Sequence, residues 1–365
     1  MGTTTEFPLN HPMAVRLWKK ALWAQSINEN PLSKLVGDSK NSLIYRHSEL
    51  EKSAGARLTY SLKRLMVGRG ITGDNILEGN EEGLNFFQDD IFIDQLRHAT
   101  RSAGKMSEQR VPHNIRNEGT DSLGLWLADR NHLSMMNHLC ANTAQSDTAY
   151  TGFNSVTAID ANHVISDSDR TIGDQSLSTS ANVFDIRLID SCKVRAQTLR
   201  FLSQTESNIR PLRVDGEDRY VIFLHPTQVR DLRTRTDAGQ WLDITKAVYQ
   251  GSKANNPIYD GAIGEYNGVI IRESVHIQQG VDSVSNASVA NTRRAVFCGA
   301  QALTLAYGGD GETAIGKYRE ELFDYGNQLG ISAGLIWGCK AATFNSTQSH
   351  GRIVVPTFAN DTATL

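Results

Sequence analysis

Apolar residues recur at helical spacing in three stretches of the chain. Met13, Leu17 and Ala21 form a stripe in residues 12–25, where Pro12 suits the first helical position. We expect a longer helix over residues 120–142, capped by Thr120 or Asp121, and another over 183–203. The expected inward faces are Leu125, Ala128, His132, Met135 and Leu139 in the former, and Leu188, Cys192, Ala196, Leu199 and Leu202 in the latter.

Alternating apolar and polar positions predict a hairpin before these helices. In residues 57–67, Leu58, Tyr60 and Leu62 share one side of an extended chain. A loop rich in glycine and acidic residues, 68–85, follows, and then an amphipathic stretch over 86–105. The pattern indicates two long strands joined by a flexible tip. Residues 26–56 have turn residues and weak periodicity, which favours an extended arm over a packed domain.

The region 214–308 has the pattern of a compact α+β unit. It begins with a buried strand, and its dipeptide Asn267-Gly268 suits a type I′ hairpin turn. Further strands are expected after it. The expected elements are a strand over 219–224, helices over 226–236 and 241–251, one long strand over 293–308, and more strand over 313–344 and 351–358.

Composition describes an ordinary globular chain. It has 365 residues, 39% of them hydrophobic and 21% charged, with a net charge of −3. This length predicts two to three units. The absence of an apolar run of about 18 residues predicts that nothing spans a membrane. The four cysteines, Cys140, Cys192, Cys298 and Cys339, lie far apart, which predicts reduced core thiols in a protein made in a cytosol.

Charge is distributed unevenly near the N-terminus. Residues 11–70 hold eleven basic and four acidic side chains, whereas residues 71–95 hold seven acidic and no basic ones. Two solvent-exposed surfaces, one rich in positive and one rich in negative charge, would explain this distribution. Alternatively, these segments meet complementary surfaces on neighbouring copies, or the basic arm lies near nucleic acid.

Two motifs suggest catalysis but lack their structural context. Residues 68–73, GRGITG, fit a dinucleotide fingerprint, yet Gly79 and Gly83 interrupt the helix that should follow. Residues 330–334, GISAG, fit a nucleophile elbow around Ser332, but the sequence after it reads as strand. His132 and His138 are six residues apart, so they cannot share a metal on one helix face. We therefore expect no enzyme, cofactor or metal.

The stretch 221–236, VIFLHPTQVRDLRTRT, places His225 at the end of a strand. Asp231 is six residues away and poorly placed to orient the imidazole, so a strand, turn and helix is favoured over an active-site edge. Val229 and Leu232 supply the inward face of the helix. Arg230, Arg233 and Arg235 then form an outward basic row, which is predicted to face another subunit.

Several stretches together carry a resemblance to a known family. They are residues 12–25, 61–99, 221–234, Trp241, 255–274 and 293–308. In this order they resemble the major capsid protein family of tailed phages, in particular podophages with N-four-like coats. The resemblance covers roughly residues 10–345. It implies an α+β Hong Kong 97-type capsid fold.

The resemblance also implies a division of the chain. Residues 1–56 would be an N-terminal arm, 57–117 an extended hairpin loop, 118–213 a peripheral domain with a long spine helix, 214–308 an axial domain, and 309–365 a return to the peripheral domain with a C-terminal tail. The candidate inter-subunit residues are Arg64, Arg69, Glu81, Glu82, Asp89 and Asp90 from the hairpin region, with Arg230, Arg233 and Arg235 from the basic row.

The implied function is the coat subunit of an icosahedral tailed-phage shell, made in the host cytoplasm and resident in the virion. Pentamers and hexamers would enclose double-stranded DNA, with portal, scaffold and decoration proteins as further partners and no membrane. Because the first helix starts by residue 12, a separate scaffold protein is expected. The alternatives are an encapsulin-like nanocompartment shell and, less favoured, a nucleotide- or ester-using enzyme.

Overall fold

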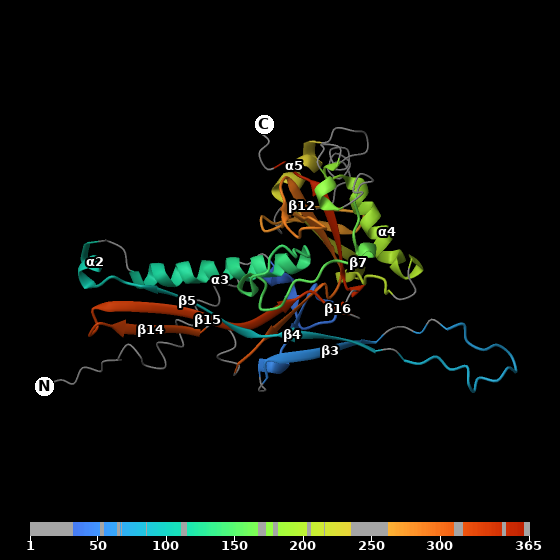
Figure 1. Ribbon diagram of the computed structural model, residues 1–365, viewed down its shortest axis with the longest axis horizontal. Coiled ribbons are helices and arrows are strands. Elements are labelled where there is room, and N and C mark those ends of the chain that lie inside the picture. The colour runs from blue at the N-terminus through green and yellow to red at the C-terminus, as the bar shows by residue number, and fades with distance from the viewer. Residues whose placement is uncertain are drawn as a thin grey trace.

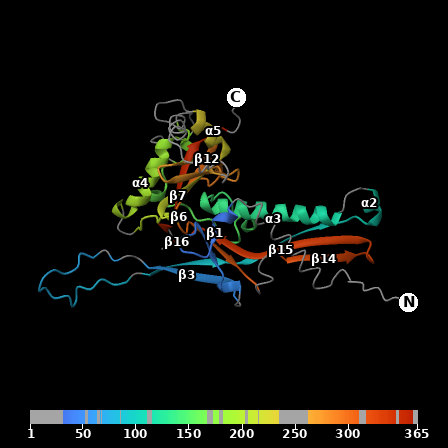
Figure 2. The same ribbon diagram turned by 180° about the vertical axis from the view of Figure 1, so that it is seen from behind.

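The computed structural model has two units and a long projecting loop (Figure 1). One unit is elongated, and the other stands on it (Figure 2). The described residues are 32–51, 55–63, 66, 68–84, 86–110, 115–166, 173–177, 182–202, 206–214, 216–234, 262–309, 317–344 and 348–360. The expected helices over 12–25 and 241–251 lie outside them.

A six-stranded sheet and a long helix build the elongated unit. The strand order is β1 (Val36–Gly37), β2 (Ile44–His47), β13 (Leu303–Tyr307), β15 (Gln328–Lys340) and β14 (Lys317–Phe323), with β5 (Asp94–Arg101) also paired to β15. Helix α3 (Ile115–Leu139) lies along this sheet, and the short α2 (Lys105–Arg110) precedes it (Figure 1). Buried Leu127, Met136 and Trp337 are part of the core between helix and sheet.

A second six-stranded sheet forms the standing unit. Its order is β18 (Arg352–Phe358), β12 (Thr292–Cys298), β7 (Glu217–Leu224), β9 (Val269–Glu273) and β8 (Ala262–Tyr266), with β6 (Leu212–Val214) on β7. Helices α4 (Ile186–Leu202) and α5 (Pro226–Thr234) belong to this unit. Their buried side chains, including Cys192, Leu199 and Leu232, share a core with Ile222 and Phe297 of the strands.

Short elements complete the described chain. They are the strand pairs β3 (Arg57–Lys63) with β4 (Phe86–Phe92), β10 (Gly280–Val281) with β11 (Ser288–Val289), and β16 (Thr343–Phe344) with β17 (Gln348–Ser349), and the single 3-10 turns η1 (Ser33–Leu35), η2 (Glu49–Glu51), η3 (Thr148–Tyr150), η4 (Ala161–His163) and η5 (Asp174–Ser176). No helix in these described ranges is both long and apolar enough to cross a membrane.

Helix α3 begins at Ile115, five residues before the predicted start, so the predicted caps Thr120 and Asp121 are wrong. Gly119 lies against the sheet, where an added Cβ would come within 3.0 Å of the Thr100 side chain. Packing against β5 and β15 thus stabilises additional helical residues on the N-terminal side of the predicted capping residues. Leu125, expected to face inward, is 49% exposed, whereas the other four predicted inward residues are buried.

The predicted long strand over 293–308 is instead two strands in two different sheets. β12 ends at Cys298, and β13 starts at Leu303 in the elongated unit. Between them a Cβ on Gly299 would meet the Arg210 carbonyl oxygen at 2.4 Å, and Gln301 has a left-handed φ of 58°. The chain therefore crosses between units here, and the standing sheet recruits β18 from the C-terminal region.

Two further predictions, a loose arm and a single long second strand of the hairpin, are wrong. Residues 32–51, predicted as part of a loose arm, are packed: Leu43 and Ile44 are buried, and β2 pairs in parallel with β13. The stretch 86–105 is not one hairpin strand, because β4 pairs with β3 whereas β5 pairs with β15.

Other local predictions are confirmed. Asn267 and Gly268 both have positive φ, 48° and 72°, as a type I′ turn requires. All four cysteines are free and buried.

Two buried arginines join the units at the C-terminal end of α3. Arg294 of β12 donates to the Asp174 carboxylate at 2.6 Å and to the Ala141 carbonyl at 2.7 Å. Arg352 of β18 donates to the Leu139 carbonyl at 3.3 Å, and burial lowers its pKa to about 10. A helix C-terminus carries partial negative charge, so both cations suit this position.

Candidate functional site

The hairpin of β3 and β4 carries the most projecting part of the molecule. The strands pair antiparallel with Arg57 opposite Phe92 and Lys63 opposite Phe86. Their alternation puts Leu58, Tyr60 and Leu62 on the more buried side, as predicted. Beyond them, residues 68–84 run away from both units as an extended loop (Figures 1 and 2).

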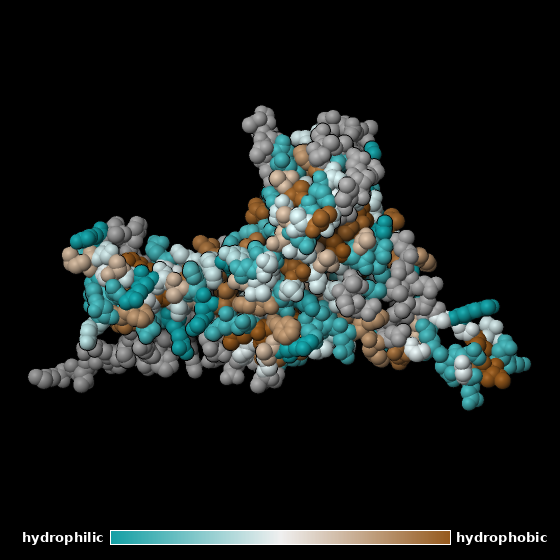
Figure 3. All heavy atoms as spheres, in the orientation of Figure 1, coloured by the Kyte–Doolittle hydropathy of each residue, from teal (hydrophilic) through white to brown (hydrophobic). Residues whose placement is uncertain are grey.

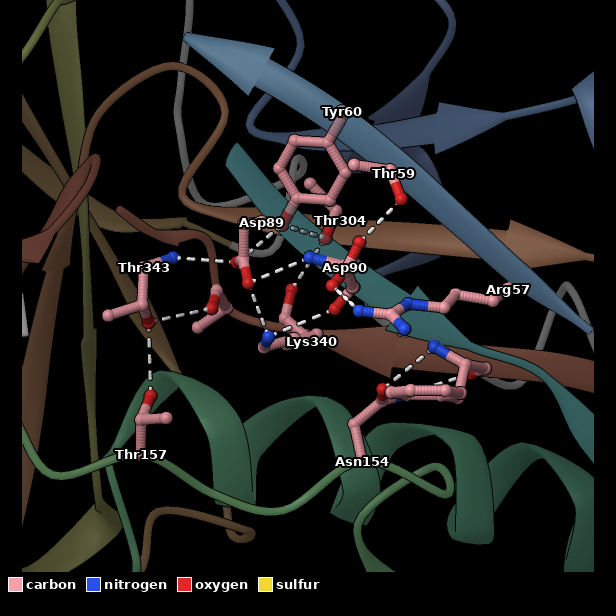
Figure 4. Close-up of polar contacts among 12 residues, drawn as sticks. Arg57, Thr59, Tyr60, Asp89, Asp90, Asn154, Thr157, Thr304, Lys340 and Thr343 are labelled. Atoms are coloured by element: carbon pink, nitrogen blue, oxygen red, sulfur yellow. Dashed lines mark hydrogen bonds and ion pairs between the residues drawn. The ribbon is translucent and has the colours of Figure 1, made fainter. Parts of the chain in front are cut away.

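A buried carboxylate anchors this hairpin to the large sheet (Figure 4). Asp89 accepts from Lys340 Nζ at 2.5 Å, from the Tyr60 hydroxyl at 2.8 Å and from the Thr343 backbone N–H at 3.0 Å. Lys340 also donates to the Asp90 carbonyl at 2.9 Å. Because the Asp89 side chain is only 8% exposed, these three donors replace the water that the carboxylate loses.

The surroundings of Asp89 shift the pKa values of neighbouring side chains in different directions. Burial, and then the negative charge of Asp89, raises the pKa of the Tyr60 phenol well above its usual value, so it stays a donor. On the outer side, Arg57 pairs with Asp90, which also accepts from the Thr59 hydroxyl. Hydrogen bonds from Arg57 lower the pKa of Asp90. Asn154 fixes the end of β4 by bonding the Phe92 N–H and C=O.

The loop itself is exposed, acidic and partly apolar. All described residues of 68–84 are exposed, including the large side chains of Ile76 and Leu77. Apolar side chains appear on the loop surface in Figure 3. Glu82 accepts from the Gly68 N–H at 2.6 Å and closes the loop at its root. No helix follows the GRGITG motif in this described segment, so the dinucleotide interpretation is excluded here.

The predicted contact residues lie in different environments. Arg69, Glu81 and Glu82 are exposed on the loop. Asp89 and Asp90 are engaged within the chain, Asp89 almost wholly buried. Lys340, Tyr60 and Thr343 were missed as partners of Asp89, and no sequence signal links them because Lys340 lies 251 residues away.

Two arginines of the basic row, Arg230 and Arg233, lie within the described residues. Arg230 bonds its neighbour Asp231 and the Asn360 carbonyl, and Arg233 is exposed. Arg64 and Arg235 lie outside the described residues.

The residues considered for catalysis have structural roles. His225 Nδ1 lies 2.8 Å from the Thr227 hydroxyl, while Asp231 bonds Arg230, so the two do not interact as a catalytic pair. Ser332 lies in mid-strand, opposite Ala99 on one side and Arg319 on the other, which a nucleophile elbow does not allow. Within the described residues no group of three or more His, Cys, Asp or Glu side chains could hold a metal ion.

A shallow cleft of about 520 Å³ lies between α3 and the segment after β9. His132 Nε2 is 3.1 Å from the Ser274 hydroxyl, and His276 pairs with Asp129 at 3.0 Å. Burial lowers the pKa of His132 to about 3, so this imidazole is neutral. Both contacts join α3 to the segment after β9, so these side chains hold the two elements together.

The large sheet, the long helix along it, the standing second unit and the projecting hairpin match known proteins over nearly the whole chain. The sequence profile described as phage capsid protein matches residues 6–360. The chain belongs to the phage capsid protein family. Its Hong Kong 97-type fold, expected from the sequence, is confirmed by the structures it resembles.

Individual relatives agree with this membership. The chain is 30% identical over 358 residues to the major capsid protein of Pseudomonas phage KPP25, covering 92% of this chain and 91% of that one. It matches the capsid of Ralstonia phage GP4 with a TM-score of 0.74 and 30% identity over 91% of each chain. The capsid of cyanophage Pam1 shares the fold, with a TM-score of 0.72 at 21% identity over 92% of this chain and 93% of that chain. The protein is thus a phage capsid protein, a structural component of the virion.

Proposed function

We propose that this capsid protein is the major coat subunit of an icosahedral tailed-phage shell, and that it forms pentamers and hexamers around double-stranded DNA. The supporting observation is the anchored hairpin with its exposed loop. Its 17-residue segment 68–84 leaves Ile76 and Leu77 exposed in the described part of the chain, and such surfaces mark protein contacts. Portal, scaffold and decoration proteins are further proposed partners. No catalytic activity is proposed.

The division into capsid domains is part of this proposal. The elongated unit with α3 would be the peripheral domain, and the standing unit with α4 and α5 the axial domain, whose loops would meet at the five- and six-fold centres. Its sheet takes in β18 as well as the strands between 217 and 298. The N-terminal arm would then be limited to the residues that precede the packed segment 32–51.

Contacts between copies are proposed for charged residues of the basic row and of the loop. Arg233 on α5, with Arg230 and Arg235, would face the next subunit around an axis, and Arg69, Glu81 and Glu82 would act from the loop. Asp89 and Asp90 would act indirectly, since their bonds to Lys340 and Arg57 hold the hairpin at its root.

Electron microscopy of the purified, expressed protein tests the proposal. Closed shells, rings or curved sheets built from five- and six-fold units are the expected result. Co-purifying cargo protein in shells without DNA would favour the nanocompartment alternative. A chain that stays monomeric under all assembly conditions would refute the proposal.

A further inference from the structure

The turn between β8 and β9 is held against α4 by side chains of the helix. Asp190 of α4 accepts from the Asn267 side-chain amide at 3.0 Å and, with its other oxygen, from the Tyr266 hydroxyl at 2.9 Å. Lys193, nearly one turn further along the helix, donates to Asn267 Oδ1 at 2.8 Å and to the Asn267 backbone carbonyl at 2.6 Å. Both polar atoms of the Asn267 side chain are therefore bound by α4.

An asparagine followed by a glycine carries the reactants of a chemical modification of the chain itself. The backbone nitrogen of Gly268 can attack Asn267 Cγ, the Cγ–Nδ2 bond then breaks, and ammonia leaves with the proton that the attacking nitrogen gives up. Water afterwards opens the resulting cyclic imide at either carbonyl, which gives aspartate or isoaspartate. Glycine has no Cβ to shield the attacking nitrogen, and Asn267-Gly268 is the one Asn-Gly pair in the sequence.

The conformation of the turn keeps these reactants apart. Asn267 and Gly268 have φ values of 48° and 72°, and Tyr266 pairs with Val269, as in a type I′ turn. In this left-handed conformation the Gly268 nitrogen lies on the opposite side of the Cα–C bond from the Asn267 Cβ. Attack on Cγ therefore requires a rotation about that bond, and the rotation breaks the turn.

Neighbouring elements oppose this rotation. The Gly268 carbonyl accepts from the Tyr220 N–H of β7 at 3.0 Å. A Cβ added to Gly268 would lie 3.5 Å from the Asp218 carbonyl oxygen and 3.6 Å from Lys193 Nζ, so the turn is packed between β7 and α4. The turn can rotate only after it has left these contacts.

We propose that Asn267 is a deamidation site that α4 keeps closed, and that it reacts when the β8–β9 turn leaves Asp190 and Lys193. The inference is independent of the proposed coat function, since it concerns a single folded chain. Either product would prevent the turn from returning to its place. Aspartate puts a second carboxylate beside Asp190 where the amide donated, and isoaspartate adds a backbone methylene to a two-residue turn. The modification would therefore loosen β8, which lies at the end of its sheet order.

Peptide mass spectrometry of the full chain, incubated in mildly alkaline buffer, tests the proposal. The peptide that contains Asn267 should gain the mass difference between an amide and a carboxyl group. In the folded chain we expect this reaction to be at least about tenfold slower than in the urea-unfolded chain, because only the locally opened fraction reacts. Asn41, which precedes Ser42 and bonds the Arg213 backbone, is an internal reference in the same digest.

Two variants remove the α4 contacts separately. Asp190→Ala and Lys193→Met should each speed deamidation of Asn267 in the folded chain by about five- to tenfold, because one or two lost hydrogen bonds shift a local equilibrium by about that factor. Arg187→Met is the matched control, since Arg187 lies on the same helix but pairs with Asp185, and its rate should equal that of the wild type. Circular dichroism checks that each variant is folded, and hydrogen exchange of β8 measures the opening.

Three results would overturn the proposal. Equal deamidation rates in the folded and the unfolded wild-type chain would mean that the fold does not keep the site closed. Unchanged rates in both folded variants would remove α4 from its control. A peptide in which Lys193 is joined to Asn267 with loss of ammonia would make the lysine, rather than Gly268, the nucleophile. Each of these results leaves the coat function untouched, because electron microscopy of assemblies tests that function separately.

Discussion

Replacing Asp89 with asparagine should free the projecting hairpin from the large sheet without unfolding the subunit. The carboxylate accepts from the Lys340 ammonium, the Tyr60 hydroxyl and the Thr343 N–H, and it is almost fully buried. Asparagine keeps one acceptor oxygen but loses the charge. Lys340, itself only 17% exposed, then loses its buried counter-charge and has only neutral oxygens, such as the Asp90 carbonyl, as acceptors in this contact.

The size of the effect follows from these contacts. A hydrogen bond to a charged group contributes about 1.5–3 kcal/mol, and a buried charge that loses its partner is costly. We expect the Asp89→Asn variant to destabilise the docked hairpin by about 2–3 kcal/mol. Since 1.4 kcal/mol corresponds to a factor of ten, the population of the opened hairpin should rise about 30- to 140-fold.

Amide hydrogen exchange of the unassembled subunit measures this population, because it reports local opening element by element. Protection should fall in β3 and β4 and stay unchanged in β7 and β12 of the standing unit. Asp90→Asn is the matched control. Its partner Arg57 is exposed, so solvent screens that pair and protection should change little. Equal loss of protection in both variants, or uniform loss over the whole chain, would refute the anchoring role of Asp89.

Three further predictions concern a buried arginine that joins the two units and buried side chains of the core. Arg294→Met leaves the buried Asp174 carboxylate without its ion pair, so the free energy of unfolding should fall by about 3–5 kcal/mol in a denaturant titration. The native chain should react with a thiol reagent only on unfolding, because burial raises the pKa of Cys140 to about 11. Burial lowers the pKa of His132 to about 3, so the folded state binds fewer protons than the unfolded state between pH 6.5 and 3. Stability should therefore fall as the pH drops through that window, and His132→Asn should flatten the dependence of Tm on pH.

The hairpin illustrates how much local pattern can predict. Alternation of Leu58, Tyr60 and Leu62 identified β3, and glycines with acidic residues identified the loop, since both are properties of neighbouring residues. The register of the hairpin and the partner of Asp89 were not predictable. Lys340 lies 251 residues away, and nothing in either segment encodes their meeting.

The strand prediction for 293–308 failed for a related reason. The residues are apolar throughout, which is the pattern of a buried strand, and β12 and β13 are both buried. Periodicity does not report which sheet a strand joins. The turn at Gln301 and the close approach of Gly299 to Arg210 belong to the packing of two units.

The sequence by itself determined the elements with a strong local signal. These are the hairpin turn at Asn267-Gly268, the helix α5 with buried Val229 and Leu232, and the buried, unpaired cysteines. It also determined the charge pattern of the loop. Each depends on residues close together in the chain.

Only the tertiary structure decided how far α3 extends, where the chain crosses between units and which carboxylates are free to meet another copy. Helix α3 starts early because Gly119 packs on Thr100, and Asp89 is occupied because Lys340 reaches it from β15. These outcomes depend on burial and on contacts between residues that are distant in sequence. Such contacts form only in the folded chain, so no local pattern encodes them.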